Sequence, residues 1–252
     1  MTRDICELRS RYDEKRSELS QSLSFVDEVP EKKLVPLYNS IGIQSQGAAA
    51  YAVFFDEFET ARSLFADAAE YSSKSITVRR KWRDELEGED WRSEPVAIHR
   101  ALISAVLSGN KQICTETSDL AQSMDKSYVD DFPDNTAQFY RVQSVGEIIA
   151  ENTSKVSLQL ISRQSEKDTN SRSKAIASLY QGFSEEDESE IQDGIQQLVS
   201  LFEERVNPKS SNPSDLFEQS ATAFFLLAHE RGFEVTVETD SLPEDYVWWI
   251  LE

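Results

Sequence analysis

Glycine and proline are both scarce in this chain of 252 residues, which holds eight of the first and seven of the second. Proteins built only of strands need many turns, and turns depend on these two residues, so such an architecture is disfavoured. Long apolar runs are also missing, and none approaches the roughly 18 positions that a membrane-spanning helix requires. Apolar residues instead recur at helical spacing along most of the chain. We therefore expect an all-α protein that does not cross a membrane.

Cysteine and histidine are rarer still, with two residues of each. Cys6 and Cys114 are far apart in the sequence and predict neither a disulfide framework nor a metal pair, which is typical of a reducing cytoplasm. Residues 1–18 are a charged mixture without the apolar segment of a secretory signal, which favours the same compartment. His99 and His229 have no cysteine, serine elbow or second histidine at a useful spacing, and no glycine-rich phosphate loop is present. The sequence therefore predicts no catalytic residue, no cofactor and no metal.

Basic residues are outnumbered, with 26 Lys and Arg against 46 Asp and Glu, which gives a net charge of −20. Such a charge repels phosphate, so direct binding of nucleic acid or of an anionic membrane is disfavoured. Two interpretations of the acidic surface stay open. It is either a halophilic adaptation to high salt or a face that meets a basic protein partner or imitates nucleic acid, and both can hold together.

The first part of the chain predicts a helical segment separate from the rest. Residues 2–27 place apolar side chains roughly on one helix face, and Pro30 ends that helix. A short segment at 32–43 has weaker helical spacing, and residues 42–47 predict a polar break. We therefore expect an N-terminal helical segment over residues 1–45.

The clearest pattern follows at residues 46–76, in the run QGAAAYAVFFDEFETARSLFADAAEYSSKSI. Ala49, Ala61, Phe65 and Ala68 are separated by 12, 4 and 3 residues, the offsets of the packing positions in a tetratricopeptide repeat. Small residues at these positions let two antiparallel helices approach closely, and the aromatic ring fills the space beside them. The pattern predicts a helix hairpin.

A second hairpin is predicted further along, with its turn at Gly109 and Asn110. Loops are expected at residues 125–135 and 164–173, where polar residues interrupt the helical spacing. These features extend the hairpin pattern over most of the chain.

Helix ends can also be predicted from the sequence. Ser184 and Ser214 are expected to cap the two helices that follow them, and Gly232 fits the position just after a helix C-terminus. Apolar and polar residues alternate at 233–238, which predicts a short strand. The fold that we predict for residues 46–252 is an all-α array of antiparallel helix hairpins, tetratricopeptide-like, closed by a short C-terminal β-strand and a final turn.

Three runs of the chain carry a family resemblance: AAAYAVFFDEFETARSLFADAAEY, ALISAVLSGNKQICTETSDLAQ and FFLLAHERGFEVTVETDSLPEDYVW. Together they resemble the Imm49 family of immunity proteins from bacterial and archaeal toxin systems, over residues 45–250. In that family a long helical body is similarly closed by a strand after an Arg-Gly pair and by a proline-containing turn. The resemblance implies a protein that binds and neutralises a cognate toxin, and it supplies no catalytic residue.

An immunity protein of this kind would act by stoichiometric binding that blocks an active site or a substrate groove. An acidic inhibitor suits a basic nuclease toxin, because the groove that attracts nucleic acid would also attract the inhibitor. Two alternatives stay open. One is a general helical-repeat adaptor without a toxin partner, and the other is an enzyme whose acidic catalytic residues are scattered along the chain.

The partner-binding surface is expected on the concave side of the array, which the first helix of each hairpin lines. These inner helices are predicted at residues 46–56, 95–107 and 136–150. Tyrosine and arginine are enriched at the energetic centres of interfaces, and an aspartate would meet a basic partner. The positions that we assign to partner binding are Tyr51, Asp56, His99, Arg100 and Tyr140. The alternative interpretation is that each of them is an ordinary surface or core position.

Overall fold

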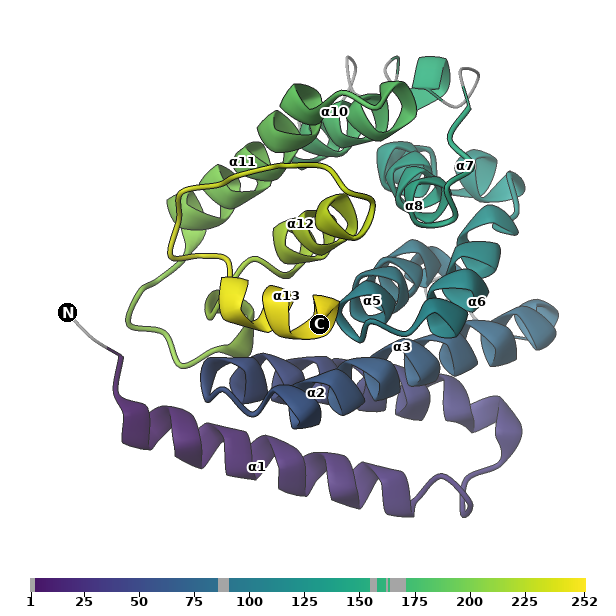
Figure 1. The fold of residues 1–252 in the computed structure, drawn as a ribbon. Helices are drawn as coiled ribbons and strands as arrows, with labels where there is room; N and C mark the ends of the chain where they lie inside the picture. The colour runs from purple at the N-terminus through teal and green to yellow at the C-terminus, as the bar shows by residue number, and fades with distance from the viewer. Residues whose placement is uncertain (1–2, 86–90, 155–157, 162, 164–170) are drawn as a thin grey trace.

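A computed structural model describes residues 3–85, 91–154, 158–161, 163 and 171–252. Figure 1 shows that regular structure in this part of the chain is helical, which confirms the all-α prediction. No helix within it combines the length and apolarity that a bilayer crossing requires. The α-helices are α1 (Ile5–Ser24), α2 (Leu34–Phe54), α3 (Phe58–Lys81), α5 (Glu94–Leu107), α6 (Lys111–Gln122), α7 (Ser127–Asp131), α8 (Thr136–Ile149), α10 (Ser171–Glu185), α11 (Glu188–Arg205), α12 (Gln219–Glu230) and α13 (Glu244–Leu251).

Short 3-10 helices join several of these elements. They are η1 (Glu31–Lys33), η2 (Arg83–Glu85), η3 (Pro133–Asn135) and η4 (Pro213–Asp215). Because α7 and η3 occupy most of residues 125–135, the loop that we expected there is itself largely helical.

Helices α2 and α3 form a closely packed antiparallel pair, as the small residues predict. Ala49, Ala61 and Ala68 are completely buried between them and their neighbours. Gly42 marks the closest approach, since a Cβ atom added there would lie 2.5 Å from the hydroxyl oxygen of Ser72. Close contact of two helices requires such residues, because any larger side chain would push the backbones apart.

The polar break expected at residues 42–47 is wrong, because α2 runs without interruption through it. The glycine at position 42 serves helix packing here and does not form a turn. The boundary that we placed after residue 45 therefore falls inside a continuous helix.

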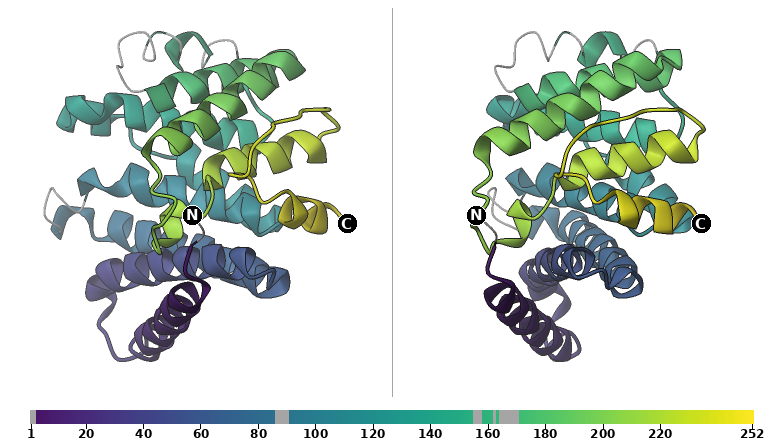
Figure 2. Two further views of the ribbon diagram at one scale, coloured as in Figure 1. Left: turned by 90° about the vertical axis from the view of Figure 1, so that its left-hand side faces the viewer. Right: turned by 60° about the vertical axis from the view of Figure 1, so that its left-hand side comes forward.

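The remaining helices form an arc whose inner side is filled by α12. Each packs on the next, with α3 on α5, α5 on α6 and α8, α8 on α10, and α10 on α11. Helix α12 contacts α11 and also reaches back to α5 (Figure 1). The views of Figure 2 show α12 between α11 and α5 from other sides. All its residues from Ser220 to Ala228 are buried, so the chain itself covers most of the expected concave surface.

Side-chain caps fix where several helices begin. Asn110 accepts hydrogen bonds from the first N–H groups of α6, and Gly109 has a φ of 61°, which confirms the predicted turn. Helix α11 is capped by Asp187 and not by Ser184, and α12 is capped by Glu218 and not by Ser214. A carboxylate accepts these bonds more strongly than a hydroxyl, and it also complements the positive end of the helix dipole.

The strand predicted at residues 233–238 is not formed. The segment is extended and its two valines are buried, but it lies along a helix and not beside another strand. Its backbone N–H groups at Glu234 and Thr236 donate to the side chains of Glu188 and Gln192 on α11, at 3.1 and 3.2 Å. The alternation of apolar residues therefore predicted a buried face correctly. The backbone N–H groups of this segment, however, bond to side chains of α11 where a strand would bond to a partner strand.

Helix α13 packs the C-terminal end of the chain against α5, in the middle of the arc. Tyr246 is fully buried, and its hydroxyl donates to the backbone carbonyl of Leu107 at the end of α5, at 2.5 Å. Its ring stacks on Trp249, with 6.2 Å between the ring centroids. Gly232, with a φ of 83°, ends α12 as predicted and starts the path towards this anchor.

Candidate functional site

The five residues assigned to partner binding lie in different environments. Tyr51 is buried, and its hydroxyl donates to the backbone carbonyl of Ser211, so it packs the core and does not face solvent. Asp56 is exposed in the turn between α2 and α3, with a φ of 56°. Tyr140 is half-buried on α8 and packs edge-on against its neighbour Phe139.

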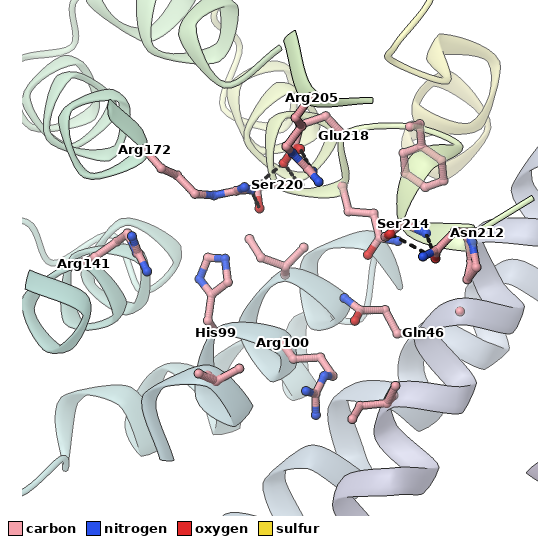
Figure 3. A pocket seen from close by; sticks show the side chains of 17 residues that line it. Gln46, His99, Arg100, Arg141, Arg172, Arg205, Asn212, Ser214, Glu218 and Ser220 are labelled. Carbon is pink, nitrogen blue, oxygen red and sulfur yellow. Dashed lines mark hydrogen bonds and ion pairs between the residues drawn. The ribbon is translucent and has the colours of Figure 1, made fainter. Parts of the chain in front are cut away.

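His99 and Arg100 are the two that the structure brings together, since both line one cavity of about 460 Å³. Helices α2, α5, α8 and α10, the end of α11, the η4 turn and the start of α12 contribute its walls. It therefore lies on the inner side of the arc, at the N-terminal end of α12. Figure 3 shows its side chains converging from these separate elements.

Arginine dominates the lining. Four arginines and one carboxylate face the cavity among the described residues, in a protein whose net charge is −20. The arginines are Arg100, Arg141, Arg172 and Arg205, and the carboxylate is Glu218. Each arginine comes from a different helix, and Figure 3 places the Arg141 and Arg172 side chains near the His99 ring. Arginine is thus concentrated around this cavity although the protein as a whole is acidic.

Glu218 joins two of these arginines to the start of α12. Its buried carboxylate accepts from Arg172 at 2.5 Å and from Arg205 at 3.3 Å. The same carboxylate accepts the backbone N–H of Ser220, at 3.3 Å, and so caps the helix. Arg172 also donates to the Ser220 hydroxyl at 2.8 Å. One side of the cavity is therefore held rigidly by charge-assisted hydrogen bonds.

The other two arginines each donate a hydrogen bond to an uncharged side chain. Arg100 donates to the side-chain oxygen of Asn39 at 2.9 Å, and Arg141 donates to the hydroxyl of Ser173 at 3.4 Å. Burial, with a smaller effect of the nearby Arg79, lowers the pKa of Arg100 to about 10, so it remains charged at neutral pH.

His99 lies between these cations. Burial is the main cause that lowers its pKa from 6.5 to about 3, and the charges of Arg172, Arg141 and Arg100 contribute to the same shift. The imidazole is therefore neutral at physiological pH. Its Nδ1 atom is buried and finds no hydrogen-bond partner among the described residues. Among the described residues, no serine hydroxyl or cysteine thiol is hydrogen-bonded to this nitrogen.

A second feature is a concentration of acidic residues on α11 and on the extended tail beside it. Residues 185–204 contain eight Asp and Glu, residues 232–245 contain five more, and neither segment contains Lys or Arg. The second segment runs beside α11, as its hydrogen bonds to Glu188 and Gln192 show. We call these two segments together the acidic face. No trio of His, Cys, Asp or Glu within the described residues is arranged to hold a metal ion.

Sequence reasoning missed three of the four cavity arginines. Arg172 fell in the linker predicted at residues 164–173, but Ser171 to Ser173 open helix α10, and residues 164–170 lie outside the described residues. Arg141 and Arg205 stand on helices that were predicted, yet nothing in their local sequence indicates that they face one another. The available signal was the presence of arginine beside apolar helix positions in an otherwise acidic chain.

Comparison with family models, with curated proteins and with solved structures finds no match to this chain.

Proposed function

We propose that this chain is an immunity protein that neutralises a cognate toxin in the cytoplasm by stoichiometric binding, without catalysis of its own. The family resemblance of three sequence runs supports the proposal. The observation that carries it further is the acidic face, which offers carboxylates without a competing cation to a basic partner. A nuclease is the toxin class that fits best, because its substrate groove must be basic to hold nucleic acid.

The acidic face is a better docking surface than the concave side. Helix α12 fills most of the concave side, and Tyr51 is part of the core. On α11, Asp193 and Glu204 are both exposed, and their separation of eleven residues puts them on the same side of the helix. We also propose that the helix array is tetratricopeptide-like. In this array α12 would occupy the concave surface on which such arrays bind a ligand.

The test uses the product of the gene adjacent to this one, provided that it is toxic when expressed alone. Co-expression of the native chain should restore growth, and the purified pair should form a complex of fixed stoichiometry by light scattering. The double variant Asp193→Lys, Glu204→Lys should weaken the complex by about tenfold or more and slow association most at low salt.

A matched variant controls for net charge. Asp13→Lys, Asp27→Lys makes the same change on and just after α1, at two exposed positions remote from α11 (Figure 1). Its affinity should stay within about twofold of the native chain. Equal weakening by both variants would show that net charge and not this face matters. A neighbouring protein that is bound but harmless would instead support the adaptor alternative.

A further inference from the structure

We infer that a groove at the start of α1 is a binding site for a small organic cation, a compound that joins a protonated amine to a flat apolar group. The groove shares no lining residue with the cavity beside His99, and the inference does not rest on the proposed toxin. It rests on the size and apolar lining of the groove, on a carboxylate at its edge, and on the charge of the protein around it.

The groove is large enough for a small molecule. It encloses about 620 Å³, which is within the range of small-molecule pockets. It lies where the start of α1, the ends of α2 and α11, the end of the η4 turn and the extended tail meet, on the side of the molecule where the chain begins (Figure 1). Because these segments are far apart in the sequence, only the completed fold forms this groove.

Apolar side chains form most of its lining. Phe202 and Leu216 are nearly buried and form the floor, whereas Phe54 and Val206 keep part of their surface exposed. Ile5, on the rim, is 58% exposed, the largest exposed fraction among the large apolar side chains that the structure describes. Covering such surface is favourable by about 25 cal/mol per Å², so the groove would stabilise a flat apolar group that lies on it.

The polar part of the lining selects the charge of the ligand. Asp240 is exposed at the edge, and no other described residue bonds to its carboxylate. Arg3 is the cation among the described lining residues, but its guanidinium donates to the backbone carbonyl of Asp215, whose negative charge also acts on it. Ser241 donates its hydroxyl to Glu203 at 2.9 Å, which places a second carboxylate beside the groove. The lining therefore offers a carboxylate to a ligand, while its cation is already engaged.

The charge of the surrounding protein acts in the same direction. Both segments of the acidic face contribute to the lining of the groove. The cations next to it in the sequence are Arg205, which pairs with Glu218, and the exposed Lys209, and the exposed carboxylates are Glu203, Glu204 and Asp240. At longer range, the net charge of −20 attracts small cations and repels anions. A ligand that fits both the walls and the charge joins an amine to an apolar ring.

The experiment titrates isotope-labelled protein with three probes at low salt and follows the amide shifts by nuclear magnetic resonance. Tryptamine carries an indole ring and an amine, ethylamine lacks the ring, and indole-acetate replaces the amine by a carboxylate. Tryptamine should bind with a Kd of about 1 mM or less, and at least about fivefold more tightly than either other probe. It should shift the amides of Ile5, Val206 and Ser241, which line the groove.

Four results would overturn the inference. They are absence of tryptamine binding, equal affinity for ethylamine, equal affinity for indole-acetate, and tryptamine shifts confined to residues outside the groove. If tryptamine does not bind and the adjacent gene product shifts the same amides, a side chain of a protein partner is the occupant instead. If the shifts depend on protein concentration alone, the occupant is a second copy of this chain.

Two variants test the charge and the wall separately. Asp240→Asn removes the carboxylate, and Ile5→Lys adds a cation at an exposed position of the apolar wall. Each should weaken tryptamine by about threefold or more. The controls Asp245→Asn and Leu23→Lys make the same changes at exposed positions that do not line the groove, and their Kd should stay within about twofold of the native value.

The test does not depend on one variant being folded. Circular dichroism and a thermal midpoint establish which variants are folded, and the amide shifts of the native protein locate the binding in every case. Native affinity in the folded variants would overturn the inference. Toxin binding is measured with changes at Asp193 and Glu204, which do not line the groove, so the two proposals can fail separately.

Discussion

Replacing Glu218 by glutamine should lower the stability of the protein. The substitution keeps the shape of the side chain but removes the charge that Arg172 and Arg205 share. It also turns an amide nitrogen, a donor, towards one of these guanidinium groups. Helix α12 would also lose the charge of its N-terminal cap.

The size of the expected loss in unfolding free energy follows from how exposed Glu218, Arg172 and Arg205 are. The Glu218 side chain is 4% exposed and Arg172 is 31% exposed, so the loss of charge from that hydrogen bond costs about 1 kcal/mol. Arg205 is 51% exposed and its bond is 3.3 Å long, so solvent screening reduces its share to about 0.3 kcal/mol. The weaker helix cap adds about 0.5 kcal/mol. Unfolding free energy should therefore fall by about 2 kcal/mol.

Urea unfolding at pH 7 and low salt gives the change in stability, with Glu204→Gln as the control because it removes an exposed carboxylate from the neighbouring helix. A stability loss within about 0.5 kcal/mol of the control would refute the role of Glu218 as a buried ion-pair centre.

Four further predictions concern the rest of the molecule. The urea midpoint should rise in molar potassium chloride, because a charge of −20 repels itself and the screening length falls to about 3 Å at 1 M; an unchanged or lower midpoint would contradict salt adaptation. Gly42→Ala should cost about 1–2 kcal/mol in a urea titration, because the new Cβ atom would lie 2.5 Å from the Ser72 hydroxyl. The same change in a Ser72→Ala background should cost less, and an equal cost would contradict the steric reason. Burial raises the pKa of Cys114 to about 12, so a thiol reagent at pH 8 should label exposed Cys6 first and Cys114 only after unfolding. The pKa of His99 is lowered by burial from 6.5 to about 3, so the unfolded chain binds its proton more tightly and stability is lost as pH falls through that interval. In urea titrations, the His99→Gln variant should therefore lose less unfolding free energy than the native chain between pH 7 and pH 5. Equal losses in the two proteins would contradict the lowered pKa of His99.

The sequence predicts the helices well because each depends on local spacing. The packing alanines of α2 and α3, the turn at Gly109 and Asn110, and the end of α12 at Gly232 all follow from neighbouring residues. Gly42 shows where local reasoning fails, because the need for a small residue comes from a helix crossing and not from a turn. The extended tail shows the same limit, since its hydrogen-bond acceptors lie on α11 and not in the adjacent sequence.

The candidate site was less predictable than the fold. His99 and Arg100 were selected from the sequence, but for a concave protein-binding surface that α12 largely fills. The cavity depends on Arg141 and Arg172, which come from helices separated from α5 in the chain. Their convergence is a property of the path of the backbone, and residue types alone do not encode it.

Helix α12 also determines when the core of the protein can finish folding during synthesis. During synthesis α5 leaves the ribosome long before α12, yet the two pack together in the finished protein. Until residues 219–230 have been made, the apolar sides of α5 and α11 lack their cover. Such non-local contacts slow folding, and the uncovered intermediate is prone to aggregation. A ribosome that stalls or terminates early would therefore release a chain with an open core, and not a shortened but folded protein.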